Sequence, residues 1–153
     1  MPGIAIVHRS ELARVRAFYE EAGYGGGVLD IDRVFAATTD GRIVGVVRLC
    51  EEEGVIVLRG MHVAAACQRQ GIGRALLARC VPWLERGEAF CLPYARLAGF
   101  YGEAGFTPAP PETLPRFLAE RLDGYRSKGQ GVLAMRRAGA AHMPNKSFAS
   151  RIA

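Results

Sequence analysis

Two tight turns separate three apolar segments in the first half of the chain, and this pattern narrows the choice of fold most. Residues 33–39 ("RVFAATT") and 42–50 ("RIVGVVRLC") are joined by Asp40 and Gly41. Asp-Gly between two apolar runs is a strong signal for a β-hairpin. The turn "EEEG" then leads into residues 55–64, "VIVLRGMHVA". The pattern therefore predicts an antiparallel meander of three strands that ends beside the two glycines of "QRQGIG".

In the remainder of the chain, segments with the apolar spacing of a helix alternate with segments typical of a strand. Residue types and spacing predict helices at four places and further strands at three, so an α/β fold is expected. Ser10 is predicted to cap the first helix, and Pro82 is predicted to bend or end the second near Val81. The expected helices span 10–23, 72–84, 95–105 and 116–122, and the additional strands span 4–7, 88–94 and 131–137.

Length and terminal composition predict one domain over residues 1–137 of the 153-residue chain, followed by a loosely ordered tail over 138–153. No segment has the apolar length of a signal peptide or a membrane span, so a cytoplasmic protein without membrane association is expected. The four cysteines lack CxxC spacing and a neighbouring histidine cluster, which predicts free thiols and no metal site. They are Cys50, Cys67, Cys80 and Cys91.

The net charge of +5 is concentrated in the tail. Four of the 20 basic residues follow Met135, where no acidic residue occurs, so residues 1–135 carry 16 basic and 15 acidic side chains. A nearly neutral body offers no broad surface for a phosphate backbone, and nucleic acid is not an expected partner. The opposing hypothesis, a nucleic-acid-binding protein that uses its tail, predicts salt-sensitive binding that is lost when the tail is removed.

The stretch "QRQGIGRALL", residues 68–77, places two glycines at the start of a predicted helix. The first amides of a helix lack intrahelical partners and lie at the positive end of the helix dipole, so they suit an anion. Hydrogens at Gly71 and Gly73 would let a diphosphate approach the backbone, with Arg69 and Arg74 adding charge at its edge. Gly-x-Gly before a helix is also a common turn. The P-loop pattern and the third glycine of the dinucleotide fingerprint are absent.

The stretch "QRQGIG" after an apolar strand resembles the Q/R-x-x-G-x-G/A signature of the GNAT acetyltransferase superfamily. A second stretch, "GFYGEAGF" at residues 99–106, is similar to the family's helix that ends in Tyr-x-x-x-Gly-Phe. Both motifs occur in the family's order. The resemblance extends from the first strand to about Arg137, and implies a mixed, mostly antiparallel, splayed sheet of about six to seven strands with helices on both faces.

The resemblance also implies acetyl-CoA as the acetyl donor and direct attack on its thioester by an amine. Tyr101 is then the acid that protonates the departing thiolate, and the backbone amide near Val63 polarises the acetyl carbonyl. Tyr94 and Leu97 replace an Asn and an Ala that commonly line the pantetheine arm in the family. The implied cofactor-binding residues are Met61, His62, Val63, Gln68, Arg69, Gln70, Gly71, Ile72, Gly73, Arg74, Tyr94 and Leu97.

The general base is not identified by the sequence. The family's strand position for such a base falls on Val57, which cannot accept a proton. Strand alternation predicts that His62 lies on the face opposite Arg59 and Met61. Arg59 is a candidate for pairing with a carboxylate or phosphate of the acceptor substrate, and pairing with a turn glutamate is the alternative.

Several alternatives remain open at this level. The acceptor amine could belong to a small molecule, a peptide or a protein, because the fold hosts many acceptors. The loops at 23–27 and 111–131 are the predicted sites of acceptor selection. A non-catalytic acyl-CoA-binding module is the main alternative to an N-acetyltransferase, and the chain is expected to be a monomer or a homodimer.

Overall fold

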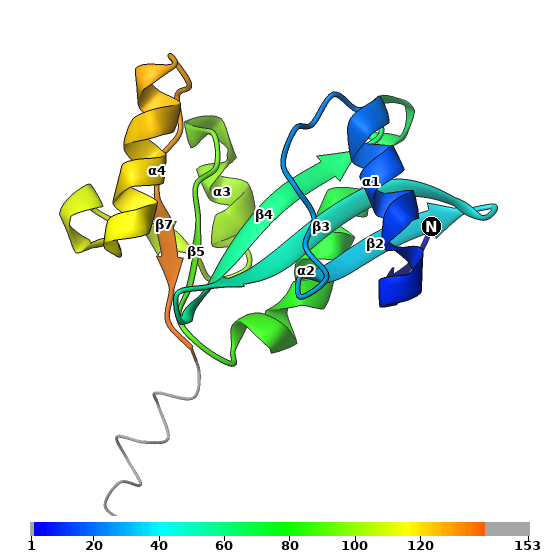
Figure 1. The fold of residues 1–153 in the computed structure, drawn as a ribbon, viewed down its shortest axis with the longest axis horizontal. Coiled ribbons are helices and arrows are strands. Elements are labelled where there is room, and N and C mark those ends of the chain that lie inside the picture. Colours follow the sequence, from blue (N-terminus) through cyan, green and yellow to red (C-terminus); the bar gives the residue numbers. More distant parts are fainter. Residues whose placement is uncertain (1, 140–153) are drawn as a thin grey trace, which may run out of the picture. The chain divides into compact units, whose positions relative to one another are not determined.

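The computed structural model describes residues 2–139, which divide into two compact units with the boundary between Pro82 and Trp83. Seven strands and four α-helices occur among the described residues. Figure 1 shows them coloured along the chain. The first unit contains β1 (Gly3–Ile6), α1 (Leu12–Glu21), β2 (Arg33–Thr39), β3 (Arg42–Glu52), β4 (Val55–Val63) and most of α2 (Ile72–Leu84). The second contains β5 (Ala89–Cys91), α3 (Ala98–Gly102), β6 (Thr107–Pro108), α4 (Arg116–Ser127) and β7 (Met135–Arg137).

The predicted meander is present in the first unit. Strands β2, β3 and β4 pair antiparallel in sequence order, and β1 pairs antiparallel with the outer edge of β2. The β2–β3 turn places Asp40 at φ 50° and Gly41 at φ 77°, the left-handed pair that an Asp-Gly hairpin requires. The β3–β4 turn repeats this arrangement, with Glu53 at φ 48° and Gly54 at φ 84°.

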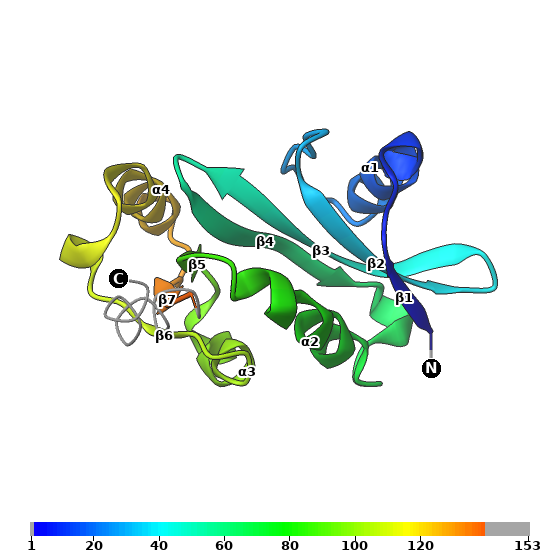
Figure 2. The same cartoon turned by 90° about the horizontal axis from the view of Figure 1, so that it is seen from below.

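Helices cover both faces of this four-stranded sheet. Figure 2 shows α1 on one side of β2 and β3, and α2 on the other. The α1 side buries a cluster formed by Leu12, Val15, Tyr19, Val28, Val34, Ala36 and Val46. On the α2 side Gly45 allows a close approach, because a Cβ there would lie 3.1 Å from Leu76 Cδ1 and 3.2 Å from Ile72 Cγ2. The start of α2 is thereby pressed against β3.

Two helix ends differ from the sequence-based predictions. A 3₁₀ turn at Arg9–Glu11 precedes α1, and its cap is His8, whose Nδ1 accepts a hydrogen bond of 3.1 Å from Ser10 N. Ser10 is therefore inside the turn instead of capping the helix. Helix α2 spans Ile72–Leu84, as the spacing of its apolar residues predicts, and does not end near Val81. A proline so close to the C-terminal end removes one helical hydrogen bond and leaves little helix to disrupt.

In the second unit β7 lies between β5 and β6 and pairs antiparallel with both. Figure 2 shows α3 and α4 on opposite sides of these strands. Leu122 of α4 packs with Val132 and Ala134 in the core of this unit. Strand β6 was not predicted, because it has only two residues, one of which is Pro108.

The expected α/β fold with about six to seven strands is confirmed, and helices flank the strands in each unit. The description as one domain over residues 1–137 stays a prediction. Of the predicted tail, residues 140–153 lie outside the described part of the chain. No helix among the described residues is long and apolar enough to cross a membrane.

Candidate functional site

The glycine loop between β4 and α2 has the backbone conformation that its residue types suggested. Arg69 has φ 65° and Gly71 has φ 82°, so two left-handed residues turn the chain sharply into the helix. The carbonyl oxygen of Gly71 accepts a hydrogen bond of 3.0 Å from Ala75 N. Gly71 therefore directly precedes the first helical residue, Ile72, and the amides that follow it belong to the first turn of a 13-residue helix.

The loop is tied to the end of β4. Gln68 Nε2 donates a hydrogen bond of 2.9 Å to the carbonyl oxygen of Val63. Ala64, the residue after Val63, donates a hydrogen bond of 2.8 Å from its backbone nitrogen to Val44 O and so remains attached to β3. A 3₁₀ turn at Ala65–Cys67 completes the connection. The predicted residues from Met61 to Val63 and from Gln68 to Arg74 therefore belong to one continuous structure.

The charges along this connection favour an anion. No Asp or Glu occurs between Glu53 and Glu85. Arg69 and Arg74 are exposed at the loop and at the first turn of α2. Arg79, one turn later, donates from its Nη1 to Ile4 O at 2.6 Å and fastens α2 to β1. The backbone amides of a helix N-terminus beside basic side chains fit a diphosphate group such as that of CoA.

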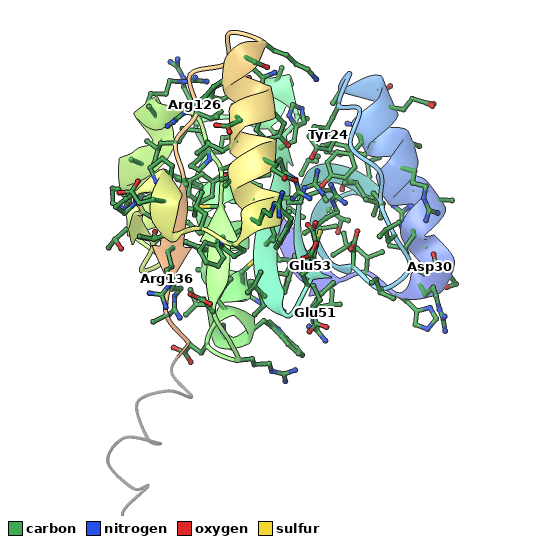
Figure 3. The ribbon with its side chains drawn as sticks, turned by 60° about the vertical axis from the view of Figure 1, so that its left-hand side comes forward. Tyr24, Asp30, Glu51, Glu53, Arg126 and Arg136 are labelled. Carbon is green, nitrogen blue, oxygen red and sulfur yellow. The ribbon has the colours of Figure 1, made fainter. Side chains whose placement is uncertain are left out.

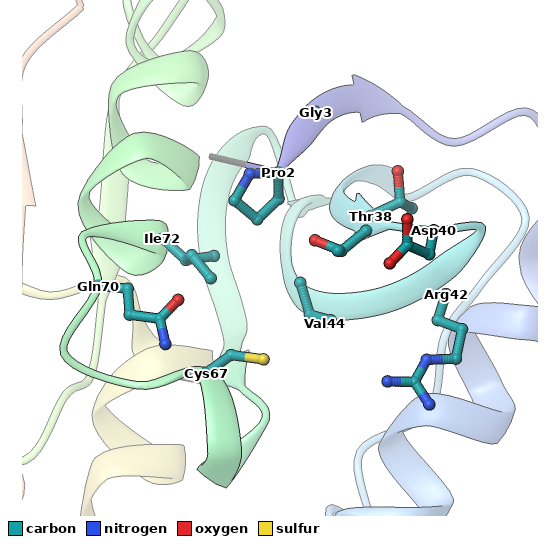
Figure 4. A pocket seen from close by; sticks show the side chains of 10 residues that line it. Pro2, Gly3, Thr38, Asp40, Arg42, Val44, Cys67, Gln70 and Ile72 are labelled. Atoms are coloured by element: carbon teal, nitrogen blue, oxygen red, sulfur yellow. The ribbon is translucent and has the colours of Figure 1, made fainter.

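A cavity of about 610 Å³ borders the same loop (Figure 4). Cys67, Gln70 and Ile72 line one wall, and Thr38, Asp40 and Arg42 of the β2–β3 hairpin line the other. Its lining mixes hydroxyl, amide and charged groups with the apolar side chains of Pro2, Val44 and Ile72. Within residues 2–139, no group of three or more His, Cys, Asp or Glu side chains could hold a metal ion.

A β-bulge in β4 changes which side chains share a face of the sheet. Val46 pairs with His62, whereas Arg48 pairs with Arg59, so Gly60 and Met61 together oppose the single residue Val47. Val46 and Arg48 are two residues apart and lie on the same face. Sequence alternation predicts that His62 and Arg59 lie on opposite faces of the sheet. This prediction is wrong, because the extra residue of the bulge shifts the alternation and puts both side chains on the same face. His62 contacts Phe18 of α1, with 5.7 Å between ring centroids.

Arg59 is partly exposed on this face. Its Nη1 lies 3.6 Å from Glu52 Oε2, and the two side chains are 28% and 21% exposed. The sequence left open whether Arg59 pairs with a turn glutamate or with a substrate. A partly exposed pair at this distance gains little energy and exchanges readily. The observed pairing is therefore compatible with later binding of another carboxylate.

The second unit contains the tyrosine motif. Tyr101 lies in α3 and is 6% exposed, with its ring edge-on to Phe100 and Phe106 at 4.9 and 6.4 Å between centroids. Gly105 has φ 94°, and a Cβ there would lie 2.9 Å from Arg137 Nε. Arg137 Nε in turn donates to Ala104 O at 2.7 Å. The glycine of the motif thus permits the turn that packs Phe106 against Tyr101.

Tyr94 and Leu97 lie immediately before α3. Tyr94 caps a 3₁₀ turn at Ala95–Leu97 and forms an isolated antiparallel bridge with Val132. Its ring is 43% exposed, and the Arg96 guanidinium lies 5.1 Å from the ring centroid. The second unit therefore brings Tyr94, Leu97 and Tyr101 together on adjoining turns, with Tyr94 accessible to a ligand.

Sequence analysis did not identify a buried ion pair beneath the loop that follows α1. Arg48 Nη1 lies 3.0 Å from Asp32 Oδ2, and these side chains are 1% and 2% exposed. Asp32 ends a loop that runs back along α1, and Figure 3 shows Tyr24 and Asp30 of this loop toward opposite ends of the helix. The sequence feature that could have indicated this ion pair is a single arginine inside the apolar run "IVGVVRLC". Such a residue is rarely buried without a partner.

Comparisons with known proteins agree with this geometry. A family model described as "Acetyltransferase (GNAT) domain" matches residues 30–108, just over half of the chain. No curated protein matches the sequence.

Solved structures share the fold at low sequence identity. A GNAT-family acetyltransferase from Streptococcus pneumoniae has a TM-score of 0.67 and 15% identity, with 91% of this chain and 99% of that chain covered. Rv2747 from Mycobacterium tuberculosis, in complex with CoA and NLQ, has a TM-score of 0.65, 18% identity and coverages of 90% and 99%.

N-acetylglutamate synthase from Neisseria gonorrhoeae, complexed with coenzyme A and N-acetyl-glutamate, has a TM-score of 0.61 and 20% identity. The alignment covers 90% of this chain but 35% of the synthase, so the chain spans about a third of that protein's length. The loop, the tyrosine motif, the fold and the family model lead to one conclusion. This chain belongs to the GNAT acetyltransferase family.

Proposed function

We propose that this protein is an acetyl-CoA-dependent N-acetyltransferase that acts by direct attack of an acceptor amine on the thioester. The observation that carries the proposal is the loop from Gln68 to Gly73. It has two left-handed residues, runs into the first turn of α2, and is tied to β4 at Val63. Backbone amides at the start of a helix suit the diphosphate of CoA, and the absence of acidic side chains from 54 to 84 removes competing charge.

In the proposed mechanism, the two ends of the connection between β4 and α2 bind different parts of acetyl-CoA. The loop amides and the neighbouring Arg69 and Arg74 hold the diphosphate, while the Val63 amide donates a hydrogen bond to the acetyl carbonyl oxygen. The amine nitrogen forms a bond to the carbonyl carbon, the C–S bond breaks and its electron pair remains on sulfur. Tyr101 gives its proton to that thiolate, and the attacking nitrogen loses a proton to solvent.

A tyrosine suits this task because its ordinary pKa is near 10, so it keeps its proton at neutral pH. Tyr101 is packed by Phe100, Phe106 and the Gly105 turn, which limits the positions of its ring. A fixed ring keeps its hydroxyl in one direction throughout the reaction.

We further propose that the acceptor carries a carboxylate that binds Arg59. The guanidinium is only partly buried and its ion pair with Glu52 spans 3.6 Å, so an incoming carboxylate can replace Glu52. A planar guanidinium matches a carboxylate in two parallel hydrogen bonds. The structure of N-acetylglutamate synthase with N-acetyl-glutamate is an example of a protein of this fold that binds an acetylated amino acid.

The experiment is release of CoA thiol from acetyl-CoA in the presence of amines offered as matched pairs. Each L-amino acid is compared with its decarboxylated amine, for example L-arginine with agmatine and L-phenylalanine with phenethylamine. Wild-type protein is expected to turn over and to prefer the carboxylate-bearing member, and Arg59→Ala is expected to lose that preference. CoA binding without acetyl transfer to any amine would favour the non-catalytic module instead.

A further inference from the structure

We propose that Tyr19 and Arg48 are positioning residues that hold the bulge of β4 and thereby aim the backbone from Met61 to Val63. This inference rests on the proposed function, in which the Val63 amide contacts the acetyl carbonyl. Neither residue is exposed enough to touch a substrate, because Tyr19 is 2% and Arg48 1% exposed. Both act through the backbone of Gly60.

Gly60 is the first residue of the bulge. It has φ 68°, and it opposes Val47 together with Met61. A Cβ at this position would lie 2.4 Å from Tyr19 Oη and 3.1 Å from Arg48 Nε. The two side chains therefore occupy the space that a glycine leaves open, and any other residue would displace them. A bulge redirects the strand after it, so the conformation of Gly60 determines where the following amides point.

Tyr19 makes the direct contact. Its hydroxyl donates a hydrogen bond of 2.7 Å to Gly60 O, linking the last turn of α1 to β4. Burial raises the pKa of Tyr19 well above its usual value, so the hydroxyl remains a donor at any working pH. The other end of the segment is fixed by Gly45, which pairs with Val63. The three residues from Met61 to Val63 are thus held at both ends.

Arg48 supports Tyr19 and connects the bulge to the loop after α1. Its guanidinium carbon lies 5.5 Å from the centroid of the Tyr19 ring. Nη1 donates to Gly27 O at 2.5 Å and to Asp32 Oδ2 at 3.0 Å, and Nη2 donates to Tyr24 Oη at 3.3 Å. Arg48 Nε is buried without a hydrogen-bond partner among residues 2–139. An arginine held by three hydrogen bonds is a rigid support for the tyrosine.

The test compares Tyr19→Phe with Val15→Ala. The first removes the hydrogen bond to Gly60, and the second removes packing from the same α1 cluster without touching Gly60. Turnover is measured by CoA-thiol release with the best amine of the panel above, and CoA affinity is measured by calorimetry. We expect Tyr19→Phe to lower kcat about three- to tenfold, the range for one lost hydrogen bond. KM for acetyl-CoA and the Kd of CoA should stay within twofold, and Val15→Ala should keep kcat within twofold.

Three results would overturn the inference: an unchanged kcat in Tyr19→Phe, an equal loss in both variants, or a loss of CoA affinity that parallels the loss of kcat. The last two would indicate general loosening of the unit. Hydrogen–deuterium exchange provides a readout that does not depend on turnover. The amides from Met61 to Val63 should exchange faster in Tyr19→Phe than in wild type or Val15→Ala, and equal rates would contradict the inference. Should Tyr19→Phe not fold, Arg48→Lys tests the same support with the charge retained.

The failure of this inference can be distinguished from failure of the proposed function. Wild-type protein that releases no CoA with any amine contradicts the proposed function. Wild-type protein that turns over, with Tyr19→Phe equally active, contradicts only the positioning role.

Discussion

The side-chain amide of Gln68 donates a hydrogen bond of 2.9 Å to the carbonyl oxygen of Val63. It joins the first residue of the glycine loop to the last residue of β4. On the proposed mechanism, Val63 contacts the acetyl carbonyl and the loop contacts the diphosphate. One hydrogen bond therefore sets the spacing between the two places where the protein holds acetyl-CoA.

Gln68→Ala should weaken acetyl-CoA binding, because the loop loses its attachment to β4. The net value of one hydrogen bond, about 0.5–1.5 kcal/mol, predicts a Kd about two- to tenfold higher. Calorimetric titration measures the change. Gln130→Ala, in an exposed loop of the second unit, is the matched control and should bind as wild type does. Equal affinity of Gln68→Ala and wild type would remove the assigned role of Gln68.

Tyr101→Phe should lower turnover and leave acetyl-CoA binding largely intact. The substitution keeps the aromatic packing with Phe106 but removes the proton that the thiolate needs. General acid catalysis contributes about 10²–10⁴ in rate, so kcat should fall by about a hundredfold or more. Steady-state CoA-thiol release supplies kcat and KM, and Thr107→Val, which removes an exposed hydroxyl from the second unit, serves as the control. A Tyr101→Phe protein with unchanged kcat would not be compatible with the proposed acid.

Cys67 should be the fastest of the four cysteines to react with a thiol reagent in the folded protein. Burial raises the pKa of Cys50 and of Cys80 to about 12, and it raises that of buried Cys91 further. These three remain neutral thiols between pH 7 and 9 and react slowly. Cys67 is partly exposed beside the glycine loop. Reaction with Ellman's reagent should show one fast thiol, which Cys67→Ser abolishes; a fast phase that survives this substitution would contradict the assignment.

Gly60→Ala and Gly124→Ala should change stability in opposite directions. At Gly60, φ is 68° and the added Cβ would lie 2.4 Å from Tyr19 Oη, so the free energy of unfolding should fall by about 2 kcal/mol or more. At Gly124, inside α4, nothing lies within 4 Å of the added Cβ. Helix propensity alone should raise the free energy of unfolding by about 0.5–1 kcal/mol. Urea denaturation measures both values, and a neutral Gly60→Ala would show that the bulge is not constrained.

The meander and the two motifs could be predicted because their signals are local. Asp40 and Gly41 adopt the left-handed conformations that their residue types favour. Gly71 does the same at the start of α2, and Gly105 at the end of the tyrosine motif. In each case a short sequence determines a short backbone conformation, and no distant contact is needed to explain it.

The bulge and the buried network could not be predicted in this way, because distant residues determine them. Gly60 looks like an ordinary strand glycine until Tyr19 and Arg48 are seen to fill the space beside it. The prediction for His62 assumed a strand without a bulge and therefore assigned this side chain to the wrong face of the sheet. The pairing of Arg48 with Asp32 likewise joins residues 16 positions apart through a loop whose path the sequence does not specify.

The central claim is that the glycine loop binds acetyl-CoA through its backbone, and Gly71→Glu tests it most directly. A glutamate side chain would introduce a negative charge where the diphosphate is expected, at a residue with φ 82°. Calorimetric titration of folded wild-type protein with acetyl-CoA should show binding, and the variant should show none or at least about a hundredfold weaker binding. Equal binding by folded Gly71→Glu, or no binding by folded wild-type protein, would contradict the account.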